Sequence, residues 1–503
     1  MSDVRLRYPI VVNYLSIIVK VLLLAIASMI IARKLNTFEY SVWGILLSLS
    51  MLYITPIALW RFWSIRYIRR GVEEAYTTAL ALTIGWIVVI IFLHLGVSKF
   101  YGILLGGEAE QLLMLGIVYV AVFILYSFEL SVISVVFPEY VGYSNILYSV
   151  LRFILIVLLV YVVRLGFLGV LLASVFNVIV VTAFIWIKLS KKIAFRKPRF
   201  DLVKKWLKMF PIPILSVLGQ NIRSLDRLVV PMFSNSELPV AYLTINYAIT
   251  QPLKMNQSVL SSLYARLLKD YDRSRARRDV EETIKLVSLP LIFISATLIV
   301  LGKPILSLMN PKYVDAFPVL IVMVLTVLMN SYFQVYFNSI KAIDTIDLQE
   351  NVRYGDLFKS NLFQAIFANF ARSFLGIIIA MTLLLSYKGD MVFYALAFPL
   401  GYAIVLPILL SWIYLKSKKL IGAGFPYKEV VKMVLASIPA ILYYYYSGAH
   451  TIMVYSFFSD APILIVHVIV GVILYGVTLL VLSDWTRSLL KASLNVLRKS
   501  FNK

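Results

Sequence analysis

The chain has 503 residues, of which 61% are hydrophobic and only 15% are charged. A water-soluble core has no room for this much apolar surface, so the composition excludes an ordinary soluble protein and indicates an integral membrane protein. The absence of cysteine excludes disulfides, thiol catalysis and zinc–thiolate sites, and the three histidines, His94, His450 and His467, lack the spacing of metal ligands. We therefore expect no metal and no cofactor.

The net charge of +23 would suit a nucleic-acid partner if the basic residues formed one soluble patch. Here they alternate with apolar segments, which is typical of signals that hold loops in the cytoplasm. We expect no nucleic-acid partner.

The apolar segments of the first part of the chain are each about 20 residues or longer, enough to cross a hydrocarbon layer of roughly 30 Å as a helix. Six of them are present: Pro9–Ala32, Phe38–Trp60, Thr77–Val97, Gln111–Val136, Val141–Val163 and Leu165–Ile187. A basic segment, 188–208, then interrupts the pattern.

Apolar segments of the same length resume after the basic segment. The next six are Met209–Phe233, Leu238–Leu263, Leu286–Leu308, Ala316–Ile340, Asn361–Tyr387 and Met391–Leu415. The last two are Val430–Tyr446 and Ala461–Leu482. The sequence thus predicts an all-α polytopic membrane protein with about fourteen transmembrane helices.

This pattern divides the chain into five parts. We expect one set of six helices over 1–187, a basic cytoplasmic linker over 188–208, a second set of six over 209–415 and two further helices within 416–483. Residues 484–503 are predicted to form an amphipathic basic tail on the cytoplasmic leaflet.

The distribution of basic residues predicts the orientation of the spans. The loops around Lys197 and Arg275 carry the densest positive charge, and short basic loops resist translocation. We therefore expect these loops and both termini to face the cytoplasm, in a multi-pass protein of the cytoplasmic membrane.

Three short motifs carry a resemblance to a known family. The stretch Ile30–Tyr40 contains Ala-Arg-Lys-Leu-Asn-Thr-Phe-Glu-Tyr, Leu225–Leu228 with Ala241-Tyr242 forms a second motif, and Ile305–Leu308 with Tyr313 and Ala316 a third. They resemble the oligosaccharide flippase, or Wzx-type polysaccharide export, family of the multidrug/oligosaccharidyl-lipid/polysaccharide (MOP) superfamily. The resemblance implies two pseudo-symmetric six-helix lobes around a central cavity, plus two C-terminal helices. It also implies movement of a lipid-linked glycan across the bilayer by alternating access.

Charged residues in the middle of predicted spans are the candidate site residues, because a charge at this depth is costly and usually faces a cavity or a partner. The cations are Lys20, Arg152, Arg223, Arg227, Lys254 and Arg372. The deep acids are Glu129 and Asp226, which are also the candidates for ion coupling. The excess of cations predicts a polyanionic ligand such as a polyprenyl diphosphate, whose phosphate oxygens suit arginine.

Structural explanations stay open beside this functional one. Arg223 and Arg227 share a helical face with Asp226, so an internal ion pair is about as well supported as a ligand role. Glu129 and Arg152 lie on consecutive spans and are candidates for mutual pairing, and Lys254 is within reach of the interface by snorkelling.

The function that these observations favour is a flippase for a polyprenyl-(di)phosphate-linked oligosaccharide, in polysaccharide or glycoprotein glycan assembly. We expect a monomer whose partners are this substrate and membrane lipids. A cation-coupled multidrug exporter of the same superfamily is the alternative, although its organic cations would favour acidic side chains in the cavity. A membrane-embedded glycosyltransferase or ligase is less well supported, because Glu108-x-Glu110 is the only paired-acid motif in a short outer loop. We therefore expect a transporter and not an enzyme.

Overall fold

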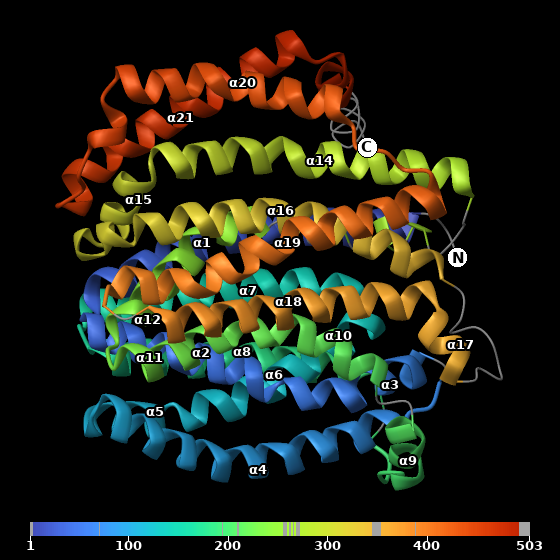
Figure 1. The fold of residues 1–503 in the computed structure, drawn as a ribbon. Helices are drawn as coiled ribbons and strands as arrows, with labels where there is room; N and C mark the ends of the chain where they lie inside the picture. The colour runs from blue at the N-terminus through green and yellow to red at the C-terminus, as the bar shows by residue number, and fades with distance from the viewer. Residues whose placement is uncertain are drawn as a thin grey trace. The chain divides into compact units, whose positions relative to one another are not determined.

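The computed structural model describes residues 4–69, 71–193, 195–208, 211–254, 259–260, 263–264, 266–267, 272–344, 354–387 and 389–491. This part of the chain is built from helices and contains no strand (Figure 1). The predicted all-α polytopic fold is confirmed.

Ten helices in the described residues are long and apolar enough to cross a membrane. They are Thr37–Ile68, Glu74–Leu105, Gly107–Val136, Glu139–Val162, Gly166–Leu189, Arg273–Val300, Pro311–Ile343, Asn361–Ser386, Met391–Ile421 and Ser459–Leu482. Each corresponds to one of the predicted spans. Helices also occupy the four other predicted positions, namely α1 (Val4–Lys34), α10 with α11, α12 (Leu238–Ile249) and α20 (Tyr427–Tyr446).

The chain divides into two compact units. The first contains residues 1–251 and 366–405, and the second contains 252–365 and 406–503. The helices α18 (Asn361–Ser386) and α19 (Met391–Ile421) therefore belong partly to each unit. This division reflects contacts within each unit, whereas the predicted boundaries at 187, 208 and 415 reflect an internal repeat of the sequence. The division therefore does not test these boundaries, which stay predictions.

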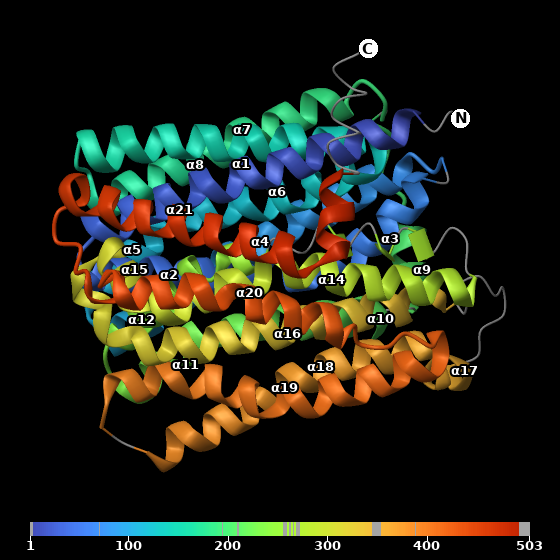
Figure 2. The same ribbon diagram turned by 90° about the horizontal axis from the view of Figure 1, so that it is seen from above.

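In the first unit, α1 runs alongside α7 (Pro138–Ile156), and α6 (Ile117–Val136) packs against α8 (Gly166–Leu189) (Figure 2). The long helix α4 (Glu74–Leu105) carries exposed apolar side chains such as Phe92 and Ile103. An aqueous surface would not favour such residues, whereas lipid solvates them.

The start of α2 (Thr37–Tyr53) is fixed by the first of the three motifs. Asn36 Oδ1 accepts from the Glu39 N–H at 2.7 Å, and Glu39 Oε2 accepts from the Asn36 N–H at 3.1 Å, which forms a capping box. Glu39 Oε1 also accepts from the Phe167 N–H at 3.2 Å and so ties this turn to the start of α8. The motif therefore has a structural role at a helix N-terminus.

The predicted span Met209–Phe233 is interrupted in the structure. It consists of α10 (Pro211–Asn221), the 3₁₀ turn η3 (Ile222–Leu225) and α11 (Asp226–Ser234). Two candidate site residues, Arg223 and Asp226, lie at this break. Interrupted helices are common where membrane transporters place polar groups.

In the second unit, α14 (Arg273–Val300) packs against α16 (Phe317–Ile343) and α20, and α20 packs against α21 (Phe457–Leu482). Phe293, Met433, Tyr444 and Tyr475 contribute to the core of this unit. Beyond α21 the chain is helical over 484–491. The rest of the predicted amphipathic tail, 492–503, lies outside the described residues.

Candidate functional site

Two of the predicted cations, Lys20 on α1 and Arg152 on α7, lie together in the first unit. Lys20 Nζ donates to Asn145 Oδ1 at 2.8 Å and lies 5.7 Å from the centre of the Tyr148 ring. Arg152 Nη1 donates to Tyr148 Oη at 2.7 Å, and the guanidinium is 6.0 Å from the ring of Trp43. Tyr148 therefore contacts both cations, because its ring lies near Lys20 and Arg152 and its hydroxyl accepts from Arg152.

Aromatic rings from three helices surround this pair. Trp43 and Tyr119 have ring centres 5.6 Å apart, and Tyr126 stacks on Tyr148 at 5.8 Å. Among the described residues, no carboxylate lies within ion-pair distance of Lys20 or Arg152. Two cations that only neutral polar and aromatic groups accompany form an electropositive site.

Glu129 on α6 does not pair with Arg152, so that structural explanation is wrong. The Tyr76 hydroxyl of α4 donates to Glu129 Oε1 at 2.8 Å, and Tyr76 also stacks on Phe128 at 6.1 Å. The side chain of Glu129 is buried, and its Oε2 has no hydrogen-bond partner among the described residues. Glu129 is therefore hydrogen-bonded to a tyrosine hydroxyl in place of the candidate partner Arg152.

Arg223 and Arg372 belong to a second polar group in the first unit. Arg223 Nε donates to Ser373 Oγ at 3.3 Å and its guanidinium lies 5.9 Å from the ring of Tyr402. Arg372 Nη2 donates to Asn369 Oδ1 at 2.7 Å. The helices α10 and α18 approach closely here, because a Cβ at Gly219 would fall 2.7 Å from Asn369 Nδ2.

Asp226 forms its ion pair with Arg227 and not with Arg223. Asp226 Oδ1 accepts from the Arg227 N–H at 2.7 Å and lies 3.9 Å from Arg227 Nε. Asp226 Oδ2 accepts a short hydrogen bond from the Tyr247 hydroxyl of α12. Both carboxylate oxygens are therefore occupied, while Arg223 is held by α18 and α19. The predicted pairing within one helix is right for Arg227.

Lys254 is the last residue of the 3₁₀ turn η4 (Gln251–Lys254) and its side chain is half-buried. It belongs to the second unit, whereas the other candidate residues belong to the first. Its membership of a common site therefore stays a prediction. The structure brings together Lys20 with Arg152, Arg227 with Asp226, and Arg223 with the residue next to Arg372.

The second unit contains a separate polar site that the sequence did not reveal. A pocket of about 610 Å³ is lined by Arg266, Arg275, Arg278, Asp279, Glu281, Glu282 and Lys285. Its acids are already engaged, since Asp279 pairs with Arg266 at 3.1 Å, Glu281 with Arg277 at 3.1 Å and Glu282 with Lys285 at 3.4 Å. The buried cations predicted from the sequence do not line this pocket.

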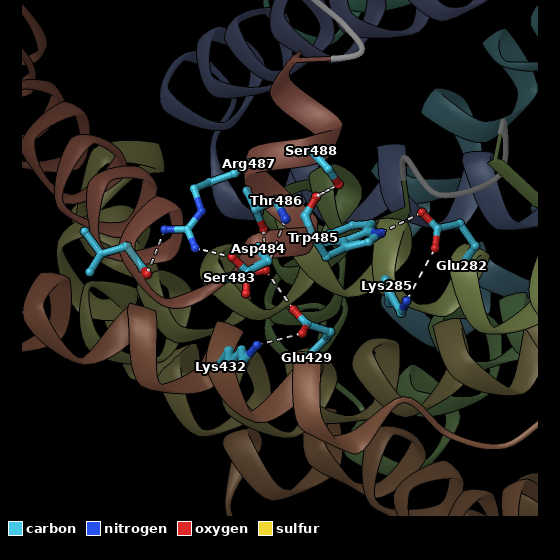
Figure 3. A network of polar contacts seen from close by, with 11 residues as sticks. Glu282, Lys285, Glu429, Lys432, Ser483, Asp484, Trp485, Thr486, Arg487 and Ser488 are labelled. Atoms are coloured by element: carbon cyan, nitrogen blue, oxygen red, sulfur yellow. Dashed lines mark hydrogen bonds and ion pairs between the residues drawn. The ribbon is translucent and has the colours of Figure 1, made fainter.

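The chain beyond α21 is attached to Glu282, one of the residues that line this pocket (Figure 3). Trp485 Nε1 donates to Glu282 Oε1 at 2.6 Å, and Ser483 Oγ donates to Glu429 Oε2 at 2.7 Å. Lys432 Nζ pairs with Glu429 Oε1 at 2.8 Å. Two carboxylates on α14 and α20 thus hold the beginning of the C-terminal segment.

No family model matches the sequence, and no curated protein sequence matches it significantly. Solved structures do match. The lipid II flippase MurJ in an inward closed conformation is 14% identical, with a TM-score of 0.68 over 95% of this chain and 100% of that one. An inward-facing MATE multidrug resistance transporter of the MOP superfamily is 13% identical, with a TM-score of 0.62 over 79% of this chain and 94% of that one.

A MOP superfamily transporter from Pyrococcus furiosus, for which a binding pocket of reverse polarity suggests a different function, is also similar. It is 13% identical, with a TM-score of 0.55 over 82% of this chain and 96% of that one. This chain therefore has the all-α polytopic fold that the lipid II flippase and MATE transporters share, and it is a multi-pass membrane protein. The finer resemblance to the Wzx-type family stays a prediction.

Proposed function

We propose that the protein is a flippase that moves a polyprenyl-(di)phosphate-linked oligosaccharide across the cytoplasmic membrane by alternating access. Such a step serves polysaccharide or glycoprotein glycan assembly and needs no enzymatic chemistry. The observation that carries the proposal is the pair of cations Lys20 and Arg152, which have no carboxylate partner among the described residues. The shared fold with transporters supports the same class of activity.

The energetic argument concerns the cost of burying positive charge. An unpaired cation inside a bilayer costs several kcal/mol, so such residues persist where a ligand or a function compensates for them. A diphosphate supplies two or more negative charges and many acceptor oxygens, and an arginine binds two of these oxygens at once. Lys20 adds a second positive charge, and its ammonium group binds an anion without the fixed planar geometry that an arginine requires.

The aromatic residues beside the cations suit the remainder of such a substrate. The rings and hydroxyl groups of Trp43, Tyr119, Tyr126 and Tyr148 are buried together in one place beside the cations. Flat rings pack against the apolar faces of sugar rings, while the hydroxyl groups donate and accept hydrogen bonds. Binding of the phosphate and of the first sugars would then use adjacent parts of one site.

A cation-coupled multidrug exporter is the second candidate, and the buried acids are the observation that favours it. Glu129 and Asp226 are buried in the first unit, where either is able to carry a proton or attract a cation. However, Asp226 is already engaged by Arg227 and Tyr247. An organic cation would also meet repulsion from Lys20 and Arg152. We therefore place the flippase first.

The test measures ligand affinity and thermal stability together. Lys20→Gln and Arg152→Gln should each weaken binding of a polyprenyl-diphosphate oligosaccharide about ten- to hundredfold, because a charge-assisted contact contributes roughly 1.5–3 kcal/mol. Lys99→Gln is the matched control, since Lys99 is exposed on α4 and should have no effect. An organic cation serves as the competing ligand.

Two outcomes would overturn the proposal. Unchanged affinity for the diphosphate with a lowered Tm in both variants would make these cations structural. Tight binding of the organic cation that strengthens when Lys20 or Arg152 is neutralised would favour the multidrug exporter.

A further inference from the structure

The short helix α9 (Phe200–Lys208) lies within the predicted linker and crosses the direction of the neighbouring spans (Figure 1). One face is buried on the first unit through Leu202 and Trp206, and the Trp206 ring lies 6.2 Å from that of Tyr67 on α3 (Ala58–Arg69). A helix that crosses the direction of the spans at their ends lies along the plane of the membrane.

The segment before α9 is fixed to the start of α4 by several contacts. Arg196 Nε pairs with Glu73 at 2.8 Å, and the Arg199 N–H donates to Thr78 Oγ1 at 2.8 Å. Phe195 packs against Tyr76 with ring centres 5.6 Å apart. These contacts with residues at the start of α4 hold the segment before α9, and so α9 itself, at this end of the first unit.

A second face of α9 is apolar but uncovered. Phe200 is 63% exposed and Leu207 is 53% exposed. They are seven residues apart and so point in nearly the same direction, with Lys204 between them on the same side. Asp201 and Lys205 are exposed on a different side of the helix. Exposure of two large apolar side chains to water is unfavourable, so we expect lipid or another molecule to cover them.

Two observations indicate that lipid is the occupant. The first is continuity, because Phe195 is exposed and contacts Trp186 at 6.1 Å, and Trp186 is itself exposed at the end of the membrane-spanning α8. The second is charge, because Lys204 is exposed on the same side of α9, and Lys191 and Lys197 are exposed in the segment before it. Apolar side chains flanked by lysines are characteristic of helices that lie in the interface of an anionic membrane.

We propose that α9 is an interfacial membrane anchor. Phe200 and Leu207 enter the boundary between headgroups and acyl chains, Lys204 contacts anionic headgroups, and Trp206 holds the helix on the protein. The anchor fixes the linker at the cytoplasmic surface of the bilayer, whatever substrate the protein carries. The proposal is thus independent of the proposed flippase activity.

The experiment uses the absence of native cysteine, which makes any introduced cysteine unique. Phe200→Cys and Leu207→Cys are each labelled with a fluorophore in the full-length protein, reconstituted into vesicles of phosphatidylglycerol and phosphatidylethanolamine. Doxyl-labelled lipid should quench both labels, and aqueous iodide should not. Asp201→Cys is the matched control and should show the reverse, because its side chain lies on the polar side of the same helix.

A second measurement tests the charge contribution. In the Leu207→Cys background, Lys204→Gln should shift the equilibrium of α9 from the membrane toward water about fivefold in anionic vesicles. No shift is expected in neutral phosphatidylcholine vesicles. An unchanged Tm verifies that each variant is folded.

The proposal is overturned if labels at positions 200 and 207 are as accessible to iodide as the label at 201. It is also overturned if both labels are shielded from iodide but unaffected by doxyl lipid, since a protein partner would then cover the face.

Discussion

Tyrosine hydroxyl groups accompany each of three charged side chains in the first unit, of which two are buried and Arg152 is half-buried. Tyr148 accepts from Arg152, Tyr247 donates to Asp226 and Tyr76 donates to Glu129. A phenol serves both signs of charge because its oxygen accepts and its hydrogen donates. In a medium without water, such a partner reduces the desolvation cost of a charged group without neutralising it. The net positive charge of the Lys20–Arg152 pair therefore persists.

The carboxylate of Glu429 makes the attachment of the C-terminal segment dependent on pH. It lies in the first turn of α20, before the predicted span. Burial acts to raise the pKa of Glu429, but hydrogen bonds from Lys432 and Ser483, with the charges of Lys432 and Lys285, lower this pKa below its ordinary value. A lowered carboxyl pKa stabilises the attached segment above the unfolded value of about 4.3, and this stabilisation is lost as the pH falls through the folded pKa.

We therefore expect the segment 484–491 to detach as the pH falls below about 4.3, because protonation removes the acceptor for Ser483 and Lys432. A fluorophore on Ser488→Cys would report the release. With Glu429→Gln in the same background, the segment should already be loosened at neutral pH and the transition should disappear. Identical pH profiles in the two proteins would contradict the prediction.

The sequence predicted the depth of the charged residues but not their partners. Lys20, Arg152 and Asp226 stand in the middle of apolar segments, so their burial follows from position alone. Tyr148 lies one turn before Arg152 on the same helix. The partners of the other two lie on other helices, Tyr247 for Asp226 and, 125 residues away, Asn145 for Lys20. With 32 tyrosines along the chain, no local pattern singles out Tyr247 as the partner of Asp226. Glu129 and Arg152 do not pair, because Glu129 accepts a hydrogen bond from Tyr76 and Arg152 donates one to Tyr148.

Among the helices, the crossing of α2 and α12 depends on a small side chain. A Cβ at Gly44 would fall 2.1 Å from Thr244 Oγ1, and nearby Ser41 Oγ donates to the Glu237 carbonyl at 2.8 Å. Small residues at such crossings let two backbones approach inside a membrane. Ser41 and Gly44, which follow the motif within α2, therefore form its contact with α12.

Gly44→Ala should destabilise the first unit by about 1–3 kcal/mol, because the added methyl overpacks the crossing. Thermal unfolding in detergent measures the effect. Thr244→Ala in the same protein should recover part of the loss by removing the clashing hydroxyl. Gly85→Ala on α4 is the control, since nothing lies within 4 Å of its Cβ and alanine favours helix by up to about 1 kcal/mol. Equal effects of Gly44→Ala and Gly85→Ala would contradict this account.

Hydrophobic length predicted the spans well, because a bilayer requires long uninterrupted apolar helices. The break at Ile222–Leu225 was not predicted, since the residues around it remain apolar enough for a continuous helix. Helix α9 was also missed, because nine residues are too few to stand out from a basic linker. Its amphipathic character becomes visible only when Leu202 and Trp206 are seen to be buried.

For the molecule as a whole, the compact units do not follow the order of the chain. Residues 366–405 join the first unit although they follow most of the second. Local hydropathy does not contain this information, which depends on contacts between distant segments. The shared fold with the lipid II flippase and MATE transporters was within reach of the sequence only through short motifs, as identities of 13–14% indicate.

The most direct test of the proposed function is movement of the substrate across a bilayer. The protein is reconstituted into vesicles that contain a fluorescent polyprenyl-diphosphate oligosaccharide, and a membrane-impermeant reductant bleaches the outer leaflet. We predict that the wild-type protein exposes the inner pool to the reductant, whereas the Lys20→Gln, Arg152→Gln double variant slows this exposure about a hundredfold or more. The Lys99→Gln control should match the wild type. Exposure at the wild-type rate by a folded double variant, or no exposure by the wild type, would contradict the account.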